Sequence, residues 1–391
     1  QTVLFKLDFL FSPQKRMALF KRFWLGLLRG GLLFLAQIKY YFKLFLSLFG
    51  KAPITVSAYR GYGNRRRIFL QGRVLKNKVI TASPDDSIWQ NLVNNYKRFG
   101  SAEIRDAELS ITIGENVFDL VTDREGYFVL DAELAKPLPP HNKKWRKAQV
   151  HLHRTRRREV NMEVSAKVLV PNRADFGVIS DIDDTILITE VRSFLKMRMI
   201  YLTFFKNVTH RKTFQEVEAF FRALQRGKDG QNRNAFFYVS KSPWNLYDFL
   251  EDFIELNDLP RGPLLLRDMG LFPRSFPFEF LDRQYRGHKI ASVARILSMY
   301  PDMPFILVGD SGERDTDIYL SIAKSFPDQV QAIYIHDLKN KRGARRIQKL
   351  IEDSGVENIK LVRSYREAAQ DAEQRGFLDM QMFEQFGKGK R

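Results

Sequence analysis

The chain contains no cysteine among its 391 residues. This absence excludes disulfide bonds, cysteine-ligated metal sites and a cysteine nucleophile, and it fits a reducing compartment. Hydrophobic residues still make up 44% of the chain, which is enough for folded cores. A chain of this length has room for two or three domains. We find no internal repeat and no low-complexity linker.

Acidic residues are scarce relative to basic ones. The chain has 45 Asp and Glu against 64 Lys and Arg, which gives a net charge of +19. Such a field attracts nucleic acid, an acidic membrane or a phosphorylated substrate. Because no helix-turn-helix signature, zinc finger or RNA-recognition pattern is present, a nucleic-acid partner is not expected.

The first 50 residues lack an uncharged run long enough to cross a membrane. The longest, residues 30–38, falls short of the roughly 20 residues that a span requires. Leucines and aromatic residues interleaved with Lys and Arg favour an apolar, basic helix that anchors in the membrane interface. A signal peptide or short span, and a helix packed on its own protein, remain alternatives. The chain begins with Gln, so residues 1–16 could also be an extension that precedes a start at Met17.

Residues 53–172 have the pattern of a small β domain. Short runs rich in Val, Ile, Tyr and Phe alternate with Gly and Asp, which predicts a β-sandwich. Residues 123–126 predict a hairpin turn, and residues 85–99 predict a helix. The predicted strands are residues 54–62, 68–74, 109–112, 117–122, 127–130, 150–153 and 160–170.

Basic residues gather near the end of this domain. Either they guard a solvated strand edge, or they contact anionic lipid. They are Lys143, Lys144, Arg146, Lys147, Arg154, Arg156, Arg157 and Arg158.

Residues 173–391 alternate between apolar runs and amphipathic stretches. This predicts a Rossmann-like α/β domain whose parallel sheet is covered by helices on both faces. Ligands of such sheets bind at the carboxyl ends of the strands. The predicted strands are residues 177–180, 236–240, 264–266, 305–309 and 331–335. The predicted helices are residues 214–224, 244–256, 289–300, 315–326, 344–352 and 365–376.

The strongest chemical signal follows the first of these strands. Asp181, Asp183 and Asp184 place three carboxylates within four residues. Like charges this close repel each other unless a cation compensates them, and hard oxygen ligands suit Mg²⁺. An Asp-rich turn without a ligand is the alternative.

Three further signals lie at the ends or starts of predicted elements. Ser240 closes the second apolar run. Lys289 opens a helix, where its charge opposes the helix dipole and therefore suggests a nearby anion. Asp310 closes another apolar run after Gly309, and Asp315 follows five residues later.

In this order, these motifs resemble the haloacid dehalogenase superfamily. The longer segments 238–247 and 262–268 look like the catalytic domain of phosphatidate phosphatases of the actin-patch type, a branch with many bacterial members. The resemblance covers residues 175–337. Residues 58–63 and 70–75 also resemble the β domain that accompanies this catalytic domain. Residues 1–50 are not covered.

The resemblance implies a role for each matching residue. Asp181 would attack phosphorus and form an aspartyl-phosphate. Asp183 would protonate the leaving alkoxide and then activate water, while Thr185 would help to orient it. Ser240 and Lys289 would donate hydrogen bonds to the phosphoryl oxygens.

The resemblance also implies a Mg²⁺ site. The ion would bind Asp181, the Asp183 carbonyl and Asp310, with Asp315 acting through water or through hydrogen bonds to the other ligands. Related lipid-binding domains lack the second aspartate and bind phosphatidate without cleaving it. Because Asp183 is present here, the resemblance favours an enzyme.

The helical insert 186–235 bears on the substrate. Its apolar start contains Arg192, Lys196, Arg198 and Lys206. It is either an ordinary amphipathic helix on the core or a surface that meets a bilayer. With the +19 charge, we expect a cytoplasmic enzyme peripheral to an anionic phospholipid membrane, which converts phosphatidate to diacylglycerol. The alternatives are a non-catalytic phosphatidate-binding module and a phosphatase of soluble esters.

Overall fold

The computed structural model describes residues 53–76, 102–182, 208–231, 233–267, 287–311, 315–337 and 341–388. The predicted N-terminal anchor, the predicted helix 85–99 and the start of the insert lie outside the described residues, as do Asp183 and Thr185. Residues 54–391 form one compact unit. Within the described ranges, no helix has the length and apolar character needed to cross a membrane.

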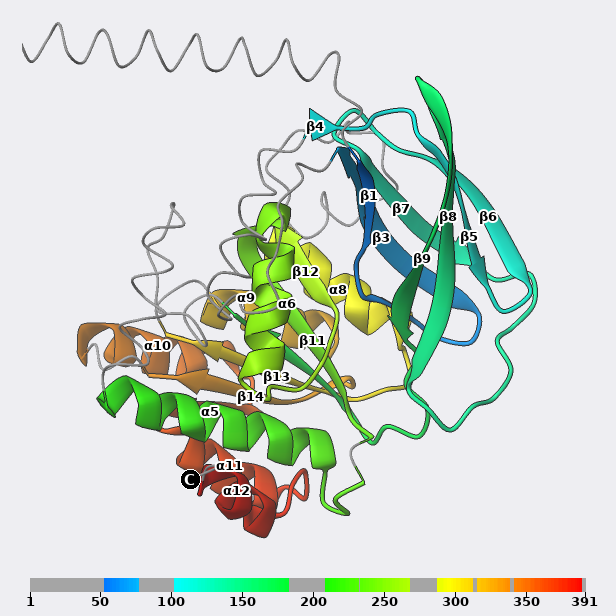
Figure 1. Ribbon diagram of the computed structural model, residues 1–391. Helices are drawn as coiled ribbons and strands as arrows, with labels where there is room; N and C mark the ends of the chain where they lie inside the picture. Colours follow the sequence, from blue (N-terminus) through cyan, green and yellow to red (C-terminus); the bar gives the residue numbers. More distant parts are fainter. Residues whose placement is uncertain are drawn as a thin grey trace, which may run out of the picture. The chain divides into compact units, whose positions relative to one another are not determined.

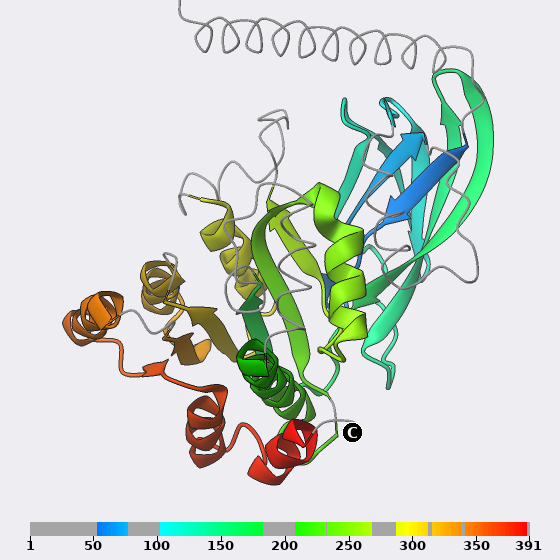
Figure 2. The same ribbon diagram turned by 60° about the vertical axis from the view of Figure 1, so that its left-hand side comes forward.

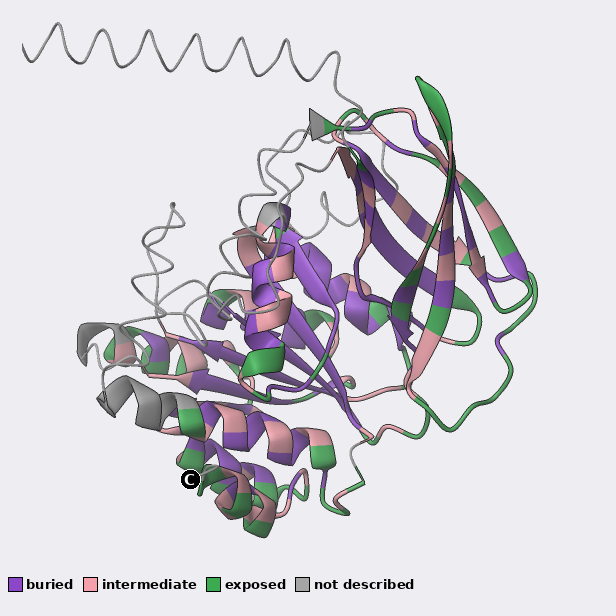
Figure 3. Cartoon of the chain, viewed as in Figure 1, coloured by how far each residue is buried: buried purple, intermediate pink, exposed green. Residues whose placement is uncertain are grey.

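A six-stranded parallel sheet forms the centre of the C-terminal part. Its order is β12-β11-β10-β13-β14-β15, and every neighbouring pair is parallel. All residues of β10 and β13 are buried, and Figure 3 shows the sheet as mostly buried. The prediction of a parallel sheet in this part of the chain is therefore confirmed. The strands are β10 (Gly177–Asp181), β11 (Ala235–Pro243), β12 (Leu264–Arg267), β13 (Phe305–Asp310), β14 (Val330–His336) and β15 (Ile359–Val362).

Helices cover both faces of this sheet. Successive strand residues point to opposite faces, so Val178 and Ile179 belong to different apolar clusters. The Val178 cluster includes residues of α5 (Val208–Arg226), α6 (Tyr247–Leu256), α11 (Tyr365–Gln374) and α12 (Met380–Gly387). The Ile179 cluster includes residues of α8 (His288–Met299), α9 (Asp315–Ser325) and α10 (Lys341–Ser354). Figures 1 and 2 both show α5 beside α12.

The N-terminal strands form one hydrogen-bonded sheet around one apolar core. Its order is β1-β3-β2-β9-β8-β5-β6, and β4 and β7 also pair with β3. The predicted strand 54–62 is divided into β1 and β2, and the other predicted strands are present. Because β2 pairs with both β3 and β9, it joins strands that a sandwich would place in two separate sheets. The strands are β1 (Ile54–Ala58), β2 (Gly61–Gly63), β3 (Arg67–Lys76), β4 (Ala102–Glu103), β5 (Glu108–Ile113), β6 (Asn116–Val121), β7 (Tyr127–Glu133), β8 (Trp145–Thr155) and β9 (Arg158–Leu169).

The predicted turn at residues 123–126 forms, but the predicted hairpin does not. The Gly126 N–H donates to the Asp123 carbonyl at 3.1 Å, and Gly126 adopts φ 79°, which a glycine tolerates best. The turn joins β6, which pairs with β5, to β7, which pairs with β3. The hairpin prediction was wrong because the local turn signal does not determine which strand β7 pairs with.

The segment between β1 and β2 contacts the parallel-sheet part of the unit. Tyr59 stacks on Trp244 with 4.9 Å between ring centroids, and the Arg60 N–H donates to the Tyr247 hydroxyl at 2.7 Å. The Arg60 guanidinium pairs with Glu251 at 2.9 Å and Glu255 at 2.5 Å. These contacts hold the N-terminal sheet against the segment that follows β11.

Candidate metal centre and active site

Two aspartates end neighbouring strands at the middle of the parallel sheet. Asp181 is the last residue of β10, and Asp310 is the last residue of β13. From β10 the sheet continues through β11 on one side and through β13 on the other, so this is the switch point where α/β sheets bind ligands. Both side chains are fully buried.

Asp315, the first residue of α9, completes an acidic cluster. Asp181, Asp310 and Asp315 each offer a carboxylate oxygen, and these oxygens lie within 4.8 Å of one another. Gly309 makes this approach possible. A Cβ atom there would lie 3.0 Å from Asp315 Oδ2 and 2.8 Å from Tyr319 Cε2.

Lys289 supplies positive charge from the first turn of α8. Its Nζ lies 2.8 Å from Asp181 Oδ1 and 2.5 Å from Asp315 Oδ1. Burial by itself would lower the pKa of Lys289, but the two carboxylates outweigh burial, and the net change in pKa is upward. Lys289 therefore stays protonated and holds two of the three carboxylates in place.

The cluster fits a divalent cation. Three carboxylates and one ammonium carry a formal net charge of −2 in a buried place, which is costly without a further cation. In addition, Asp315 Oδ2 is buried and accepts no hydrogen bond from the described residues. Closely spaced carboxylate oxygens are ligands that suit Mg²⁺. Asp181, Asp310 and Asp315 would hold the ion.

Ser240 lies at the same edge of the sheet. It follows Val239, which is the register partner of Asp181, and its side chain is fully buried. The Ser240 Oγ accepts a hydrogen bond from the Ser242 N–H at 2.9 Å. The strand β11 continues to Pro243, past the end that the sequence predicted at Ser240, so Ser240 lies within β11, one position beyond the register partner of Asp181.

His288 was not expected to contribute to the site. Its ring nitrogen lies 3.4 Å from the Leu265 carbonyl within β12. Burial lowers the pKa of His288 to about 4, so the ring is neutral near pH 7. The residue ties the start of α8, and with it Lys289, to the edge of the sheet. Its position just before Lys289 was the only available signal in the sequence.

The structure brings together four of the predicted site residues: Asp181, Lys289, Asp310 and Asp315. Asp315 lies in the cluster itself. The roles of Gly309 and Tyr319 were missed. A glycine before a strand-end aspartate could have pointed to a close packing contact, but the Tyr319 hydroxyl, which donates to the Val308 carbonyl at 3.1 Å, gave no signal.

The solved structures that align with this chain resemble it only weakly. A carbohydrate acetylesterase from Xanthomonas citri aligns with 72% of this chain and 68% of its own, but at 9% identity and a TM-score of 0.24.

Comparisons of sequence are more specific. The chain is 35% identical over 164 residues to phosphatidate phosphatase APP1 of Saccharomyces cerevisiae, which covers 42% of this chain and 26% of that protein. It is 28% identical over 222 residues to an uncharacterized protein of Schizosaccharomyces pombe, which covers 56% of this chain and 34% of that protein. The chain thus spans about a third or less of these relatives. Residues 176–337, which contain the whole acidic cluster, match the family model of the phosphatidate phosphatase APP1 catalytic domain.

Proposed function

We propose that this protein is a Mg²⁺-dependent phosphatase that hydrolyses a lipid phosphomonoester, with phosphatidate as substrate and diacylglycerol as product. One observation carries the proposal. A buried cluster of three carboxylates and one lysine lies at the strand ends of the segment that matches a phosphatidate phosphatase catalytic domain.

The chain's own residues suggest how the reaction would proceed. Asp181 would attack phosphorus, so that an oxygen–phosphorus bond forms at its carboxylate while the bond to the lipid alkoxide breaks. Asp183 would give its proton to that alkoxide and then take a proton from the water that hydrolyses the aspartyl-phosphate. Lys289, 2.8 Å from Asp181, would keep the nucleophile ionised and oriented. Ser240 would donate to a phosphoryl oxygen. A divalent cation held by Asp181, Asp310 and Asp315 would supply neutralising charge.

The test is phosphate release from phosphatidate in mixed micelles, measured with Mg²⁺ and with chelator. Asp181→Asn should reduce the rate by at least about 1,000-fold because it removes the nucleophile. Asp119→Asn, in β6 and outside the cluster, is the matched control and should keep full activity. Two results would count against the proposal. Release from soluble esters but not from lipid would refute the substrate, and binding of phosphatidate vesicles without any release would indicate a non-catalytic module.

We also propose that the protein acts at the cytoplasmic surface of an anionic membrane. The support is the net charge of +19 and the apolar, basic character of residues 17–50. In the β sheet, Arg154 and Arg156 already pair with Glu108 and Asp106, which supports the strand-edge interpretation for these two residues. Because the proposed anchor is residues 17–50, their deletion should reduce the fraction of protein that sediments with acidic vesicles. Unchanged binding would rule out the anchor.

A further inference from the structure

Tyr365 has a buried hydroxyl that the described residues leave without a hydrogen bond. It is the first residue of α11, its exposed fraction is 1%, and it lies beyond the segment that matches the family. A buried polar group without a partner is destabilising, so the presence of this hydroxyl calls for an explanation. A phenylalanine would fill the same space without that cost.

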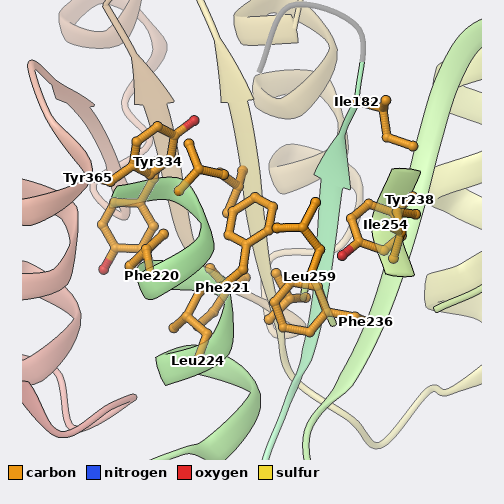
Figure 4. Packing of buried hydrophobic residues seen from close by; sticks show 14 of the residues in the cluster. Ile182, Phe220, Phe221, Leu224, Phe236, Tyr238, Ile254, Leu259, Tyr334 and Tyr365 are labelled. Carbon is orange, nitrogen blue, oxygen red and sulfur yellow. The ribbon is translucent and has the colours of Figure 1, made fainter. Parts of the chain in front are cut away.

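Aromatic packing fixes the place of this hydroxyl. The Tyr365 ring stacks on His336 with 4.9 Å between centroids and an interplanar angle of 25°. It also meets Phe220 at 5.8 Å and Phe221 at 6.3 Å, both from α5. Figure 4 shows these phenylalanines grouped with Tyr365 beside the sheet. Because the ring is held between α5 and β14, it has little freedom to turn its hydroxyl elsewhere.

The Tyr365 ring lies at the end of β14, the strand that neighbours Asp310 of the acidic cluster. His336, on which the ring stacks, is the register partner of Asp310 across β13 and β14. Burial raises the pKa of Tyr365, and the carboxylates of Asp310 and Asp181 raise it further. The group is therefore a protonated donor on the side of the sheet where Asp310 ends β13.

We propose that Tyr365 is a positioning residue of the metal centre, whose hydroxyl donates a hydrogen bond to the oxygen ligands of the cation on the Asp310 side. The proposal deepens the proposed function and rests on it for the presence of the cation. Lys289 holds Asp181 and Asp315 by charge, whereas Tyr365 adds a neutral donor near Asp310. A neutral donor orients a ligand oxygen without adding a second positive charge that would compete with the ion.

Tyr365→Phe removes one oxygen and tests this directly. The measurement is the melting temperature as a function of Mg²⁺ concentration, beginning in chelator. In chelator the variant should melt at the wild-type temperature or slightly above it, because the lost hydroxyl had no partner. With Mg²⁺, its apparent dissociation constant should be about 10–100-fold weaker than that of the wild type.

Tyr334→Phe is the matched control from the same aromatic group. The Tyr334 hydroxyl donates to Asp371 Oδ2 at 2.9 Å, away from the cluster. This variant should melt at a lower temperature in chelator yet bind Mg²⁺ with the wild-type constant. Comparison of the two variants therefore distinguishes a hydroxyl that stabilises the fold from a hydroxyl that contributes to Mg²⁺ binding.

Two results would overturn the inference: a Mg²⁺ constant within twofold of wild type in Tyr365→Phe, or a wild-type protein that shows no Mg²⁺ response. If Tyr365→Phe binds Mg²⁺ with nearly the wild-type constant and the wild type hydrolyses phosphatidate, the positioning role is refuted and the proposed function stands. Conversely, a wild type that releases no phosphate but binds Mg²⁺ through Tyr365 would refute the function and keep the positioning role.

Discussion

His288 is a neutral residue beside the charged cluster, and its protonation would make the stability of the fold depend on pH. Its ring is partly buried and sits against the Leu265 carbonyl, so protonation would place a second cation next to Lys289. Burial lowers its pKa from 6.5 to about 4. The unfolded chain therefore binds a proton at this residue at higher pH than the folded chain does, and folding is penalised as pH falls from 6.5 toward 4.

We expect the melting temperature of the wild type to fall between pH 6.5 and pH 4 by more than that of His288→Gln, whose amide does not titrate. The difference in unfolding free energy at pH 4 should be roughly 2 kcal/mol, since each unit of pKa corresponds to about 1.4 kcal/mol and the ring is partly solvated. Thermal denaturation across this range measures it, with His141→Gln as a control at an exposed histidine. Parallel profiles for wild type and His288→Gln would contradict the expectation.

At the residue scale, the sequence predicted the acidic side chains better than their partners. Asp181, Asp310 and Lys289 were found because strand-end carboxylates and a lysine at a helix start are unusual without a reason. The anion that Lys289 implied is supplied in the structure by Asp181 and Asp315. Tyr365 could not be predicted, because an aromatic residue at a helix start is ordinary core material until its hydroxyl is seen to lack a partner.

At the scale of elements, the loop between β1 and β2 contacts the short helix η2 (Trp244–Leu246) and α6. The Arg60 side chain is 5% exposed and pairs with two glutamates of α6, whose side chains are 30% and 39% exposed. Such a pair is worth more than an exposed one, because removal of the arginine leaves acidic groups partly desolvated and uncompensated.

Arg60→Met should lower the free energy of unfolding by about 2–4 kcal/mol, measured by urea denaturation. Arg154→Met is the matched control: its partner is Glu108, and their side chains are 62% and 44% exposed, so the loss should stay below about 1 kcal/mol. Equal losses in the two variants would show that Arg60 does not fasten the β sheet to α6.

The elements that the sequence predicted best are those with continuous apolar runs. The strands β10 and β13 were found because every residue in them is buried. The edge strand β15 was missed because it has only four residues and Lys360, which is partly buried, interrupts its apolar run. The prediction of a hairpin after β6 was wrong for a related reason. The strand with which β7 pairs depends on the whole sheet and not on the turn before it.

At the scale of the molecule, the two sheets share apolar clusters. Tyr59 and Tyr127 belong to the cluster on one face of the parallel sheet, and Tyr62 and Phe69 belong to the cluster on the other. Tyr62 lies edge-on to Phe237 of β11 with 5.8 Å between ring centroids. These two residues are more than 100 positions apart, and no local pattern in the sequence records their contact.

Because the clusters are shared, we expect residues 54–388 to unfold in one calorimetric transition. Two substitutions of the same kind test this. Phe128→Ala empties a site in the core of the β sheet, and Phe220→Ala empties one in the core of the parallel sheet. Each should cost about 3–5 kcal/mol, and each should lower the same transition as a whole, by on the order of 5–10 °C. If Phe128→Ala instead shifted one transition while phosphate-releasing activity survived to the wild-type temperature, the two sheets would be independent folding units, and the β sheet would be a separate module beside the enzyme.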